Sequence, residues 1–148
     1  TLFDMWADSL LAAERGHLLR LLVWGATSTL TGTTIFTWLI ATRRESALLK
    51  HFAIQTAAWG ALDVAICAAG WPTLALRDLA GAVRLDRFIW MNVGLDAGYV
   101  MVGATLAIVG WRFGRRLGLV GAGIGVVVQG AALLLLDLAL TTQLVRVA

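Results

Sequence analysis

Apolar residues fill four long stretches of this chain, and polar residues gather in the short segments between them. Each stretch exceeds 20 residues, which is long enough for an α-helix to cross the hydrocarbon core of a membrane. We therefore predict a single-domain, all-α integral membrane protein that forms a four-helix bundle. The predicted spans are residues 18–41, 48–70, 88–111 and 117–145.

The segments outside the spans carry weaker patterns. Residues 1–17 place apolar residues along one side of a helix and acidic residues along the other, which predicts an amphipathic helix on the membrane surface. Docking of this segment onto a partner protein is the alternative. In residues 71–87, leucines alternate with charged residues, and we predict a short interfacial helix there.

Basic residues are divided equally between the two ends of the predicted bundle. The first and third loops hold six of the twelve, and the termini and the longer middle loop hold the other six. Loops on the cytoplasmic side of a membrane are enriched in Lys and Arg. Because the basic residues are denser in the two short loops, we predict that these loops lie in the cytoplasm and that both termini lie outside it. We read the net charge of +3 as loop arginines and not as a nucleic-acid surface.

The second and fourth spans share a repeated motif. QTAAWGALD, from Gln55 to Asp63, matches QGAALLLLD, from Gln129 to Asp137, at five of nine positions. A weaker G-A-T-x-x-x-x-G pattern begins at residue 25 and again at residue 103. We interpret these matches as a duplicated two-helix hairpin whose copies share one orientation in the membrane. Chance matching of small apolar residues is the alternative.

The third span carries a polar face. Asn92, Asp96 and Tyr99 fall at i, i+4 and i+7 and so share one side of a helix. A carboxylate at the bilayer centre costs at least about 2.5 kcal/mol on the insertion scale, so Asp96 is expected to face protein or water. Gly94 and Gly98 form a G-x-x-x-G around it, which predicts close approach of a neighbouring helix.

Three spans each contain one aspartate: Asp63, Asp96 and Asp137. Because successive spans run in opposite directions, all three fall in the same half of the membrane. Arg20 and His17, at the start of the first span, lie toward that side, which makes Arg20 the expected cation. In a low dielectric, three carboxylates cannot all stay ionised beside one arginine. At least one is therefore expected to be protonated or bonded to a tyrosine, an indole N–H or water.

Three interpretations of these polar residues stay open. They bond the helices together, they form a site that handles a proton or a solute, or some face outward and bind another subunit. The glutamines fit all three. In the fourth span, Gly121 and Gly125 predict close packing against another helix. The candidate residues of the polar cluster are Asp63, Asp96, Asp137, Asn92, Tyr99, Arg20, Gln55 and Gln129.

Composition narrows the class of protein. Hydrophobic residues make up 59% of the 148, the mean hydropathy is +0.82 and only 14% of residues are charged, more apolar than a soluble domain of this size requires. Cys67 is the only cysteine, which excludes an intrachain disulfide, and His17 and His51 fit no metal spacing. No catalytic motif is present, so we expect a non-enzymatic protein without cofactor, metal or nucleic-acid partner.

The third span resembles a family of small four-span bacterial membrane proteins of unknown function. The resemblance rests on N-x-G-L-D-x-x-Y-x-x-x-G, which begins at Asn92, and on Trp-Gly-Ala starts at Trp24 and Trp59. The Arg- and Ala-rich composition is similar to actinobacterial proteins. In that setting the chain looks like an accessory four-helix subunit of the mammalian-cell-entry (Mce) lipid-transport complex. That likeness implies a role beside a permease and an ATPase, with no catalytic residues of its own.

Two functions follow as expectations. The first is a non-catalytic accessory subunit of a larger complex in the bacterial inner (plasma) membrane, one that moves lipid or fatty acid. Its partners would be the bilayer and other integral membrane subunits, such as the permease of a lipid transporter. The alternative is a small independent carrier that handles a proton or a solute through Asp63, Asp96 and Asp137.

Overall fold

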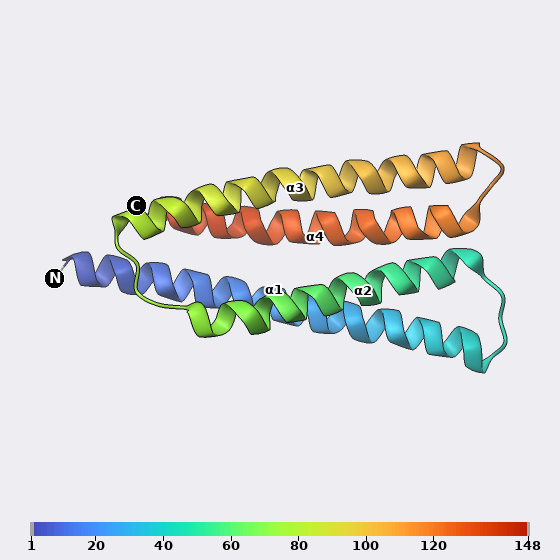
Figure 1. Cartoon of the computed structure of the whole chain (residues 1–148), viewed down its shortest axis with the longest axis horizontal. Coiled ribbons are helices and arrows are strands. Elements are labelled where there is room, and N and C mark those ends of the chain that lie inside the picture. Colours follow the sequence, from blue (N-terminus) through green and yellow to red (C-terminus); the bar gives the residue numbers. More distant parts are fainter. Residues whose placement is uncertain (1, 148) are drawn as a thin grey trace.

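The computed structural model describes the backbone of residues 2–147 and the side chains of residues 5–145, and it contains four long α-helices (Figure 1). The described residues contain no strand, so the predicted all-α class is confirmed. The elements are α1 (Leu2–Ala41), α2 (Ala47–Gly70), the 3₁₀ helix η1 (Trp71–Thr73), α3 (Leu79–Arg112) and α4 (Leu117–Val147).

The helices pair as two hairpins, α1–α2 and α3–α4, whose turns lie at the same end of the molecule (Figure 1). Each turn holds an arginine with a left-handed backbone, Arg43 (φ 51°) or Arg115 (φ 47°). Each also places a guanidinium over an indole: Arg44 lies 5.2 Å from the Trp38 ring centroid, and Arg115 lies 4.4 Å from that of Trp111. The two basic loops are therefore built alike.

Glycines allow the helices of each hairpin to approach closely, but the two hairpins use different registers. A Cβ added to Gly25 would lie 2.8 Å from the Cβ of Asp63. One added to Gly103 would lie 2.7 Å from the carbonyl oxygen of Gly123, which precedes Asp137 by 14 residues. The sequence correspondence of Gly25 with Gly103 therefore does not extend to the packing.

The N-terminal segment continues α1 and is not a separate surface helix. α1 is unbroken from Leu2, and Leu10, which is 3% exposed, packs with Ile89, Leu140 and Leu144. The apolar side of the segment thus faces α3 and α4, which corrects the prediction that it lies flat on the membrane. Residue 1 and the side chains of residues 2–4 lie outside the described part of the chain.

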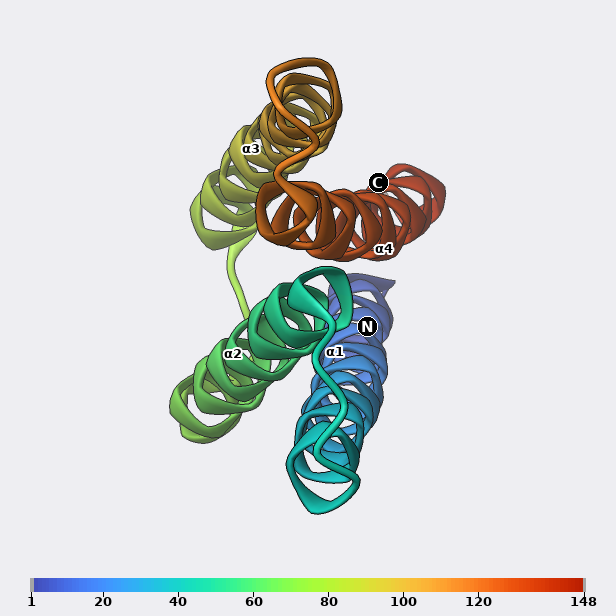
Figure 2. The same ribbon diagram turned by 90° about the vertical axis from the view of Figure 1, so that its right-hand side faces the viewer.

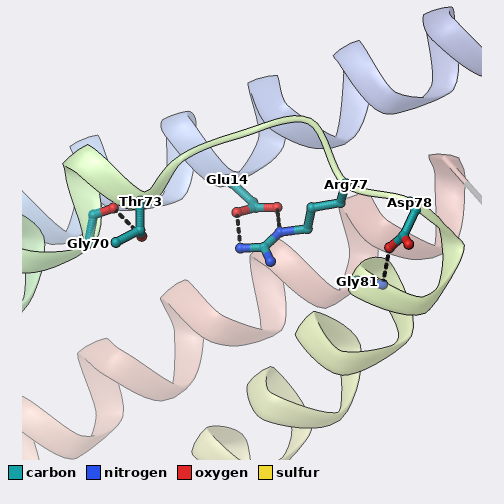
Figure 3. A network of polar contacts seen from close by, with 6 residues as sticks. All are labelled: Glu14, Gly70, Thr73, Arg77, Asp78 and Gly81. Carbon is teal, nitrogen blue, oxygen red and sulfur yellow. Dashed lines mark hydrogen bonds and ion pairs between the residues drawn. The ribbon is translucent and has the colours of Figure 1, made fainter.

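The middle loop contains no separate interfacial helix, which corrects that prediction as well. Residues 74–78 follow η1 without regular structure, and α3 begins at Leu79. The side chain of Asp78 caps α3 by accepting a 2.7 Å hydrogen bond from the backbone N–H of Gly81 (Figure 3). The alternation of leucines and charges in residues 79–87 therefore belongs to the first turns of α3.

The hairpins meet mainly through α4, which packs against α2 and α1. A Cβ on Gly121 would overlap the carbonyl oxygen of Leu48, and one on Gly125 would lie 2.9 Å from the Cβ of Gln55. The close packing expected at these two glycines is therefore present. By contrast, α2 and α3 pack only sparsely against each other within the described part of the chain. The end-on view shows them standing apart, joined by the connection that follows η1 (Figure 2).

Three helical segments are long and apolar enough to cross a membrane, as in a multi-pass membrane protein: Ala47–Thr73, Leu79–Arg112 and Leu117–Val145. The helix α1 is more polar, because it contains six threonines and one serine between residues 27 and 37. Several of these hydroxyls bond to the helix itself. Thr27 and Thr29, for example, donate to the carbonyl oxygens of Val23 (2.7 Å) and Gly25 (2.8 Å).

Candidate functional site

A cavity of about 520 Å³ lies between the two hairpins and is lined by residues of all four helices. Its inner end, away from the α2–α3 connection, is lined by Trp59 of α2 and Tyr99 of α3, whose rings meet edge to face with centroids 5.0 Å apart. Asp63, Asp96 and Asp137 all line it, and we call it the acidic cavity. The half of the bundle that holds it also holds the chain termini and the α2–α3 connection (Figure 1).

The three aspartates come from three different helices and are all buried. Their exposed fractions are 1% for Asp63, 4% for Asp96 and 7% for Asp137. The sequence argument placed them in one half of the bundle, and the structure brings them to one cavity. None of them faces outward, so the interpretation that some bind another subunit directly loses its basis.

Gln129 joins three helices beside the acidic cavity. Its side chain is buried, and its Oε1 accepts a 3.1 Å hydrogen bond from the indole Nε1 of Trp24 on α1. Its Nε2 donates to Oδ2 of Asp63 on α2. The amide therefore satisfies one carboxylate oxygen and one indole at once, which binds α4 to both helices of the first hairpin.

His17 is the basic side chain that contacts the aspartates. Its Nε2 lies 3.3 Å from Oδ1 of Asp137, and both residues are buried. Asp96 lies within hydrogen-bonding reach of Asp137. Oδ2 of Asp96 is buried and accepts no hydrogen bond from the described residues. One carboxylate oxygen at the cavity is thus left unsatisfied.

Arg20 does not join the aspartates, which corrects the expectation that it is their nearest cation. It lines a separate, apolar groove between α1 and α4, together with Val23 and Leu136. Its Nε and Nη2 are buried without a partner in the described part of the chain. The reason is helical geometry: three residues at about 100° each place the Arg20 side chain about 60° to one side of His17, on the side of α1 that faces the separate groove and away from Glu14 and Leu21.

Glu14 and Arg77 form an ion pair at the end of the acidic cavity nearest the α2–α3 connection (Figure 3). Arg77 Nε and Nη2 donate to the two carboxylate oxygens of Glu14 at 2.5 and 2.9 Å, a bidentate arrangement. These bonds raise the pKa of Arg77 above its ordinary value, so the guanidinium stays charged. The pair fastens the connection to α1.

The sequence argument did not assign a role to Glu14 or Trp24, and it left Arg77 in a loop. A usable signal was the spacing of Leu10, Glu14, His17 and Leu21, which continues one helix face without a break from the N-terminal segment into α1. Arg77 carried no such signal, because its position depends on the path of the connection.

The remaining predicted residues divide between the cavity and other places. Asn92 and Tyr99 line the acidic cavity, whereas Gln55 lies on the α2–α4 contact beside Gly125. Gly94 and Gly98 pack against nothing in the described part of the chain, because a Cβ at either would meet no atom within 4 Å. Their G-x-x-x-G pattern therefore marks an open face of α3.

The arrangement suits a proton or an organic group better than a metal ion. No three His, Cys, Asp or Glu side chains in the described part of the chain are placed to bind one metal ion together. The cavity instead offers three aspartate carboxyl groups, an imidazole and an amide, with Leu62, Ile66 and Phe88 among the apolar groups beside them. Such a lining binds a group that is partly polar and partly apolar.

Residues 20–138 match a family described as a family of unknown function (DUF6992). The chain belongs to this family. The DUF6992 match contains all three aspartates and Gln129, and it starts after Glu14 and His17. No match was found among the curated proteins or among the solved structures.

Proposed function

We propose that this protein is a small membrane carrier whose acidic cavity takes up a proton or a small solute. The observation that carries the proposal is Asp96, which is 4% exposed, lines the cavity and has a buried oxygen without a hydrogen-bond partner among the described residues. A buried, unsatisfied carboxylate oxygen is costly, and such groups occur where a ligand or proton satisfies them in part of a working cycle.

A purely structural role accounts for the other two aspartates better than for Asp96. Asp63 bonds to Gln129, and Asp137 lies beside His17, so both hold helices together. A carboxylate that served only as a link between helices would have its buried oxygens engaged. The distinction between the two roles therefore rests on whether Asp96 gains and loses a proton.

The carrier proposal includes a fourth crossing of the membrane by α1. Gly25 and Gly32 pack directly on α2, against Asp63 and Ala53, and both of these lie inside an apolar segment long enough to span. A helix in such contact shares the depth of its neighbour, and its threonine hydroxyls that bond within α1 need no water. The setting that we propose, by resemblance, is a bacterial inner membrane.

Infrared difference spectroscopy of the reconstituted protein tests the proposal. A protonated carboxyl group gives its own C=O band, and we expect such a band to appear and disappear reversibly as the pH is changed. Asp96→Asn should remove that titrating band, and Glu45→Gln, in the exposed hairpin turn, should leave it in place. A spectrum without any titrating band assigned to Asp96 would reduce this residue to a fixed structural group and overturn the proposal.

A second function, an accessory subunit of a larger membrane complex, is favoured by a different observation. Gly94 and Gly98 form an open G-x-x-x-G face on α3, and small residues at this spacing let another helix approach closely. The partner that we propose is an integral membrane subunit, such as the permease of a lipid transporter.

Purification in mild detergent followed by mass spectrometry tests the accessory function. The wild-type chain should bring down a membrane subunit in fixed ratio, and Gly98→Leu should lose it while the isolated chain stays folded, because the position is open. Recovery of the chain by itself would leave the carrier as the sole proposal.

A further inference from the structure

We infer that the acidic cavity binds a lipophilic organic cation, with the charged group against the aspartates and the apolar part between α2 and α3. This inference rests on the proposed carrier function and names its class of solute. It draws on three independent features of the cavity: the sign of its charges, the apolar gap beside them, and the aromatic wall at its inner end.

The charges that line the cavity favour a cation. Three carboxyl groups face one imidazole, that of His17, while Glu14 and Arg77 satisfy each other. Arg20 contributes nothing inside, because it faces the separate groove between α1 and α4. A cationic ligand would be attracted by the three carboxyl groups, whereas an anion would be repelled by them.

The cavity also has an apolar side that opens where α2 and α3 stand apart. Leu62 and Ile66 of α2 and Phe88 and Leu95 of α3 line it, and each is about half exposed, between 48% and 54%. α2 and α3 pack only sparsely against each other here (Figure 2). A hydrated metal or a small polar cation would leave this side unused, whereas a cation with apolar substituents would cover it.

The inner end of the cavity adds an aromatic wall. Trp59 and Tyr99 face each other across the gap between α2 and α3 and line the same cavity as Asp96. Indole and phenol rings attract cations over their faces, most strongly where water is excluded. The volume of about 520 Å³ is within the usual range, roughly 300–1,000 Å³, for sites that hold small molecules.

Three probe ions of matched design test this inference on the full-length protein in nanodiscs of neutral lipid. Tetraphenylphosphonium is a lipophilic cation, tetraphenylborate has the same shape with the opposite charge, and tetramethylammonium has the charge without the apolar surface. Binding is followed by calorimetry against empty nanodiscs. We expect tetraphenylphosphonium to bind in a one-to-one ratio and the other two to bind at least roughly tenfold more weakly.

Variants locate the binding. Asp96→Asn should weaken tetraphenylphosphonium binding by roughly tenfold to a hundredfold, because it removes a negative charge that attracts the cation in a site of low dielectric; the ion has no hydrogen-bond donor, so the whole loss is electrostatic. Asp137→Asn serves as a second variant in the same cavity if Asp96→Asn fails to fold. Glu45→Gln removes a carboxylate at the far end of the molecule and should bind as the wild type does.

The outcomes separate this inference from the proposed function. Equal binding of tetraphenylborate, or tetraphenylphosphonium binding that is unchanged in Asp96→Asn, would overturn the inference. If the carboxyl band of Asp96 titrates while tetraphenylphosphonium does not bind, the inference fails and the carrier proposal stands. If the band is absent as well, both fail together.

Discussion

Gln129 offers the sharpest test of what holds the two hairpins together. Its amide is 3% exposed and bonds to Trp24 on α1 and Asp63 on α2. Gln129→Leu keeps a side chain of similar size and removes both bonds. The substitution thus leaves an indole N–H and a carboxylate oxygen unsatisfied between the helices.

The expected loss can be worked from these contacts. A hydrogen bond between membrane helices contributes about 0.6 kcal/mol on average, with a maximum near 1.7. A buried partner left unsatisfied costs about 1–3 kcal/mol more. Part of that cost is relieved when the freed groups find other partners, so we expect Gln129→Leu to lower the free energy of unfolding by about 2–4 kcal/mol.

The internal repeat supplies a matched control. Gln55 occupies the position equivalent to Gln129, but it is partly exposed. Its side chain forms no hydrogen bond with the described residues. Gln55→Leu should therefore change stability by less than about 0.5 kcal/mol. Both variants are compared by denaturation in mixed micelles, followed by circular dichroism and tryptophan fluorescence. If Gln129→Leu is no more destabilising than Gln55→Leu, the reasoning about the bridge is refuted.

Two further stability predictions follow from the packing and from the ion pair, each read as a shift in the same unfolding midpoint. Gly121→Ala should destabilise by about 1–3 kcal/mol, because the added Cβ overlaps the Leu48 carbonyl, whereas Gly94→Ala, in open space, should be neutral or stabilising; equal effects would contradict the packing. Arg77→Gln should destabilise the protein more than Glu14→Gln does, because it leaves the more deeply buried charge without a partner. The Glu14 side chain is 7% exposed, whereas that of Arg77 is 31% exposed. The reverse order would show that Glu14 has another partner.

Helical spacing and hydropathy were sufficient to predict four helices and to place the aspartates in one half of the bundle. The predicted first and second spans end where α1 and α2 end, at residues 41 and 70. The aspartates were placed correctly in one half of the bundle because the side of a hairpin on which a residue falls depends only on helix direction. These local rules predict how far along its helix each aspartate lies, and that position alone decides in which half of the bundle it falls.

Other features of the site depend on contacts between helices, which the sequence could not specify. Arg20 and His17 are three residues apart, and only the orientation of α1 against α4 decides which of them reaches Asp137. The bond between Glu14 and Arg77 joins positions 63 residues apart. The N-terminal segment was predicted to be a surface helix because its apolar side was expected to contact lipid. In the structure that side packs against α3 and α4.

The cavity owes its chemistry to a difference between the hairpins and not to their repeat. In the first hairpin, Gly25 packs directly beside Asp63, and α4 supplies Gln129 to that aspartate. The equivalent aspartate of the second hairpin, Asp137, has Asp96 as its neighbour, so two carboxyl groups meet with only His17 beside them. Two exact copies would have satisfied both aspartates in the same way. Asp96, whose Oδ2 has no hydrogen-bond partner among the described residues, lines the cavity where α2 and α3 pack only sparsely against each other.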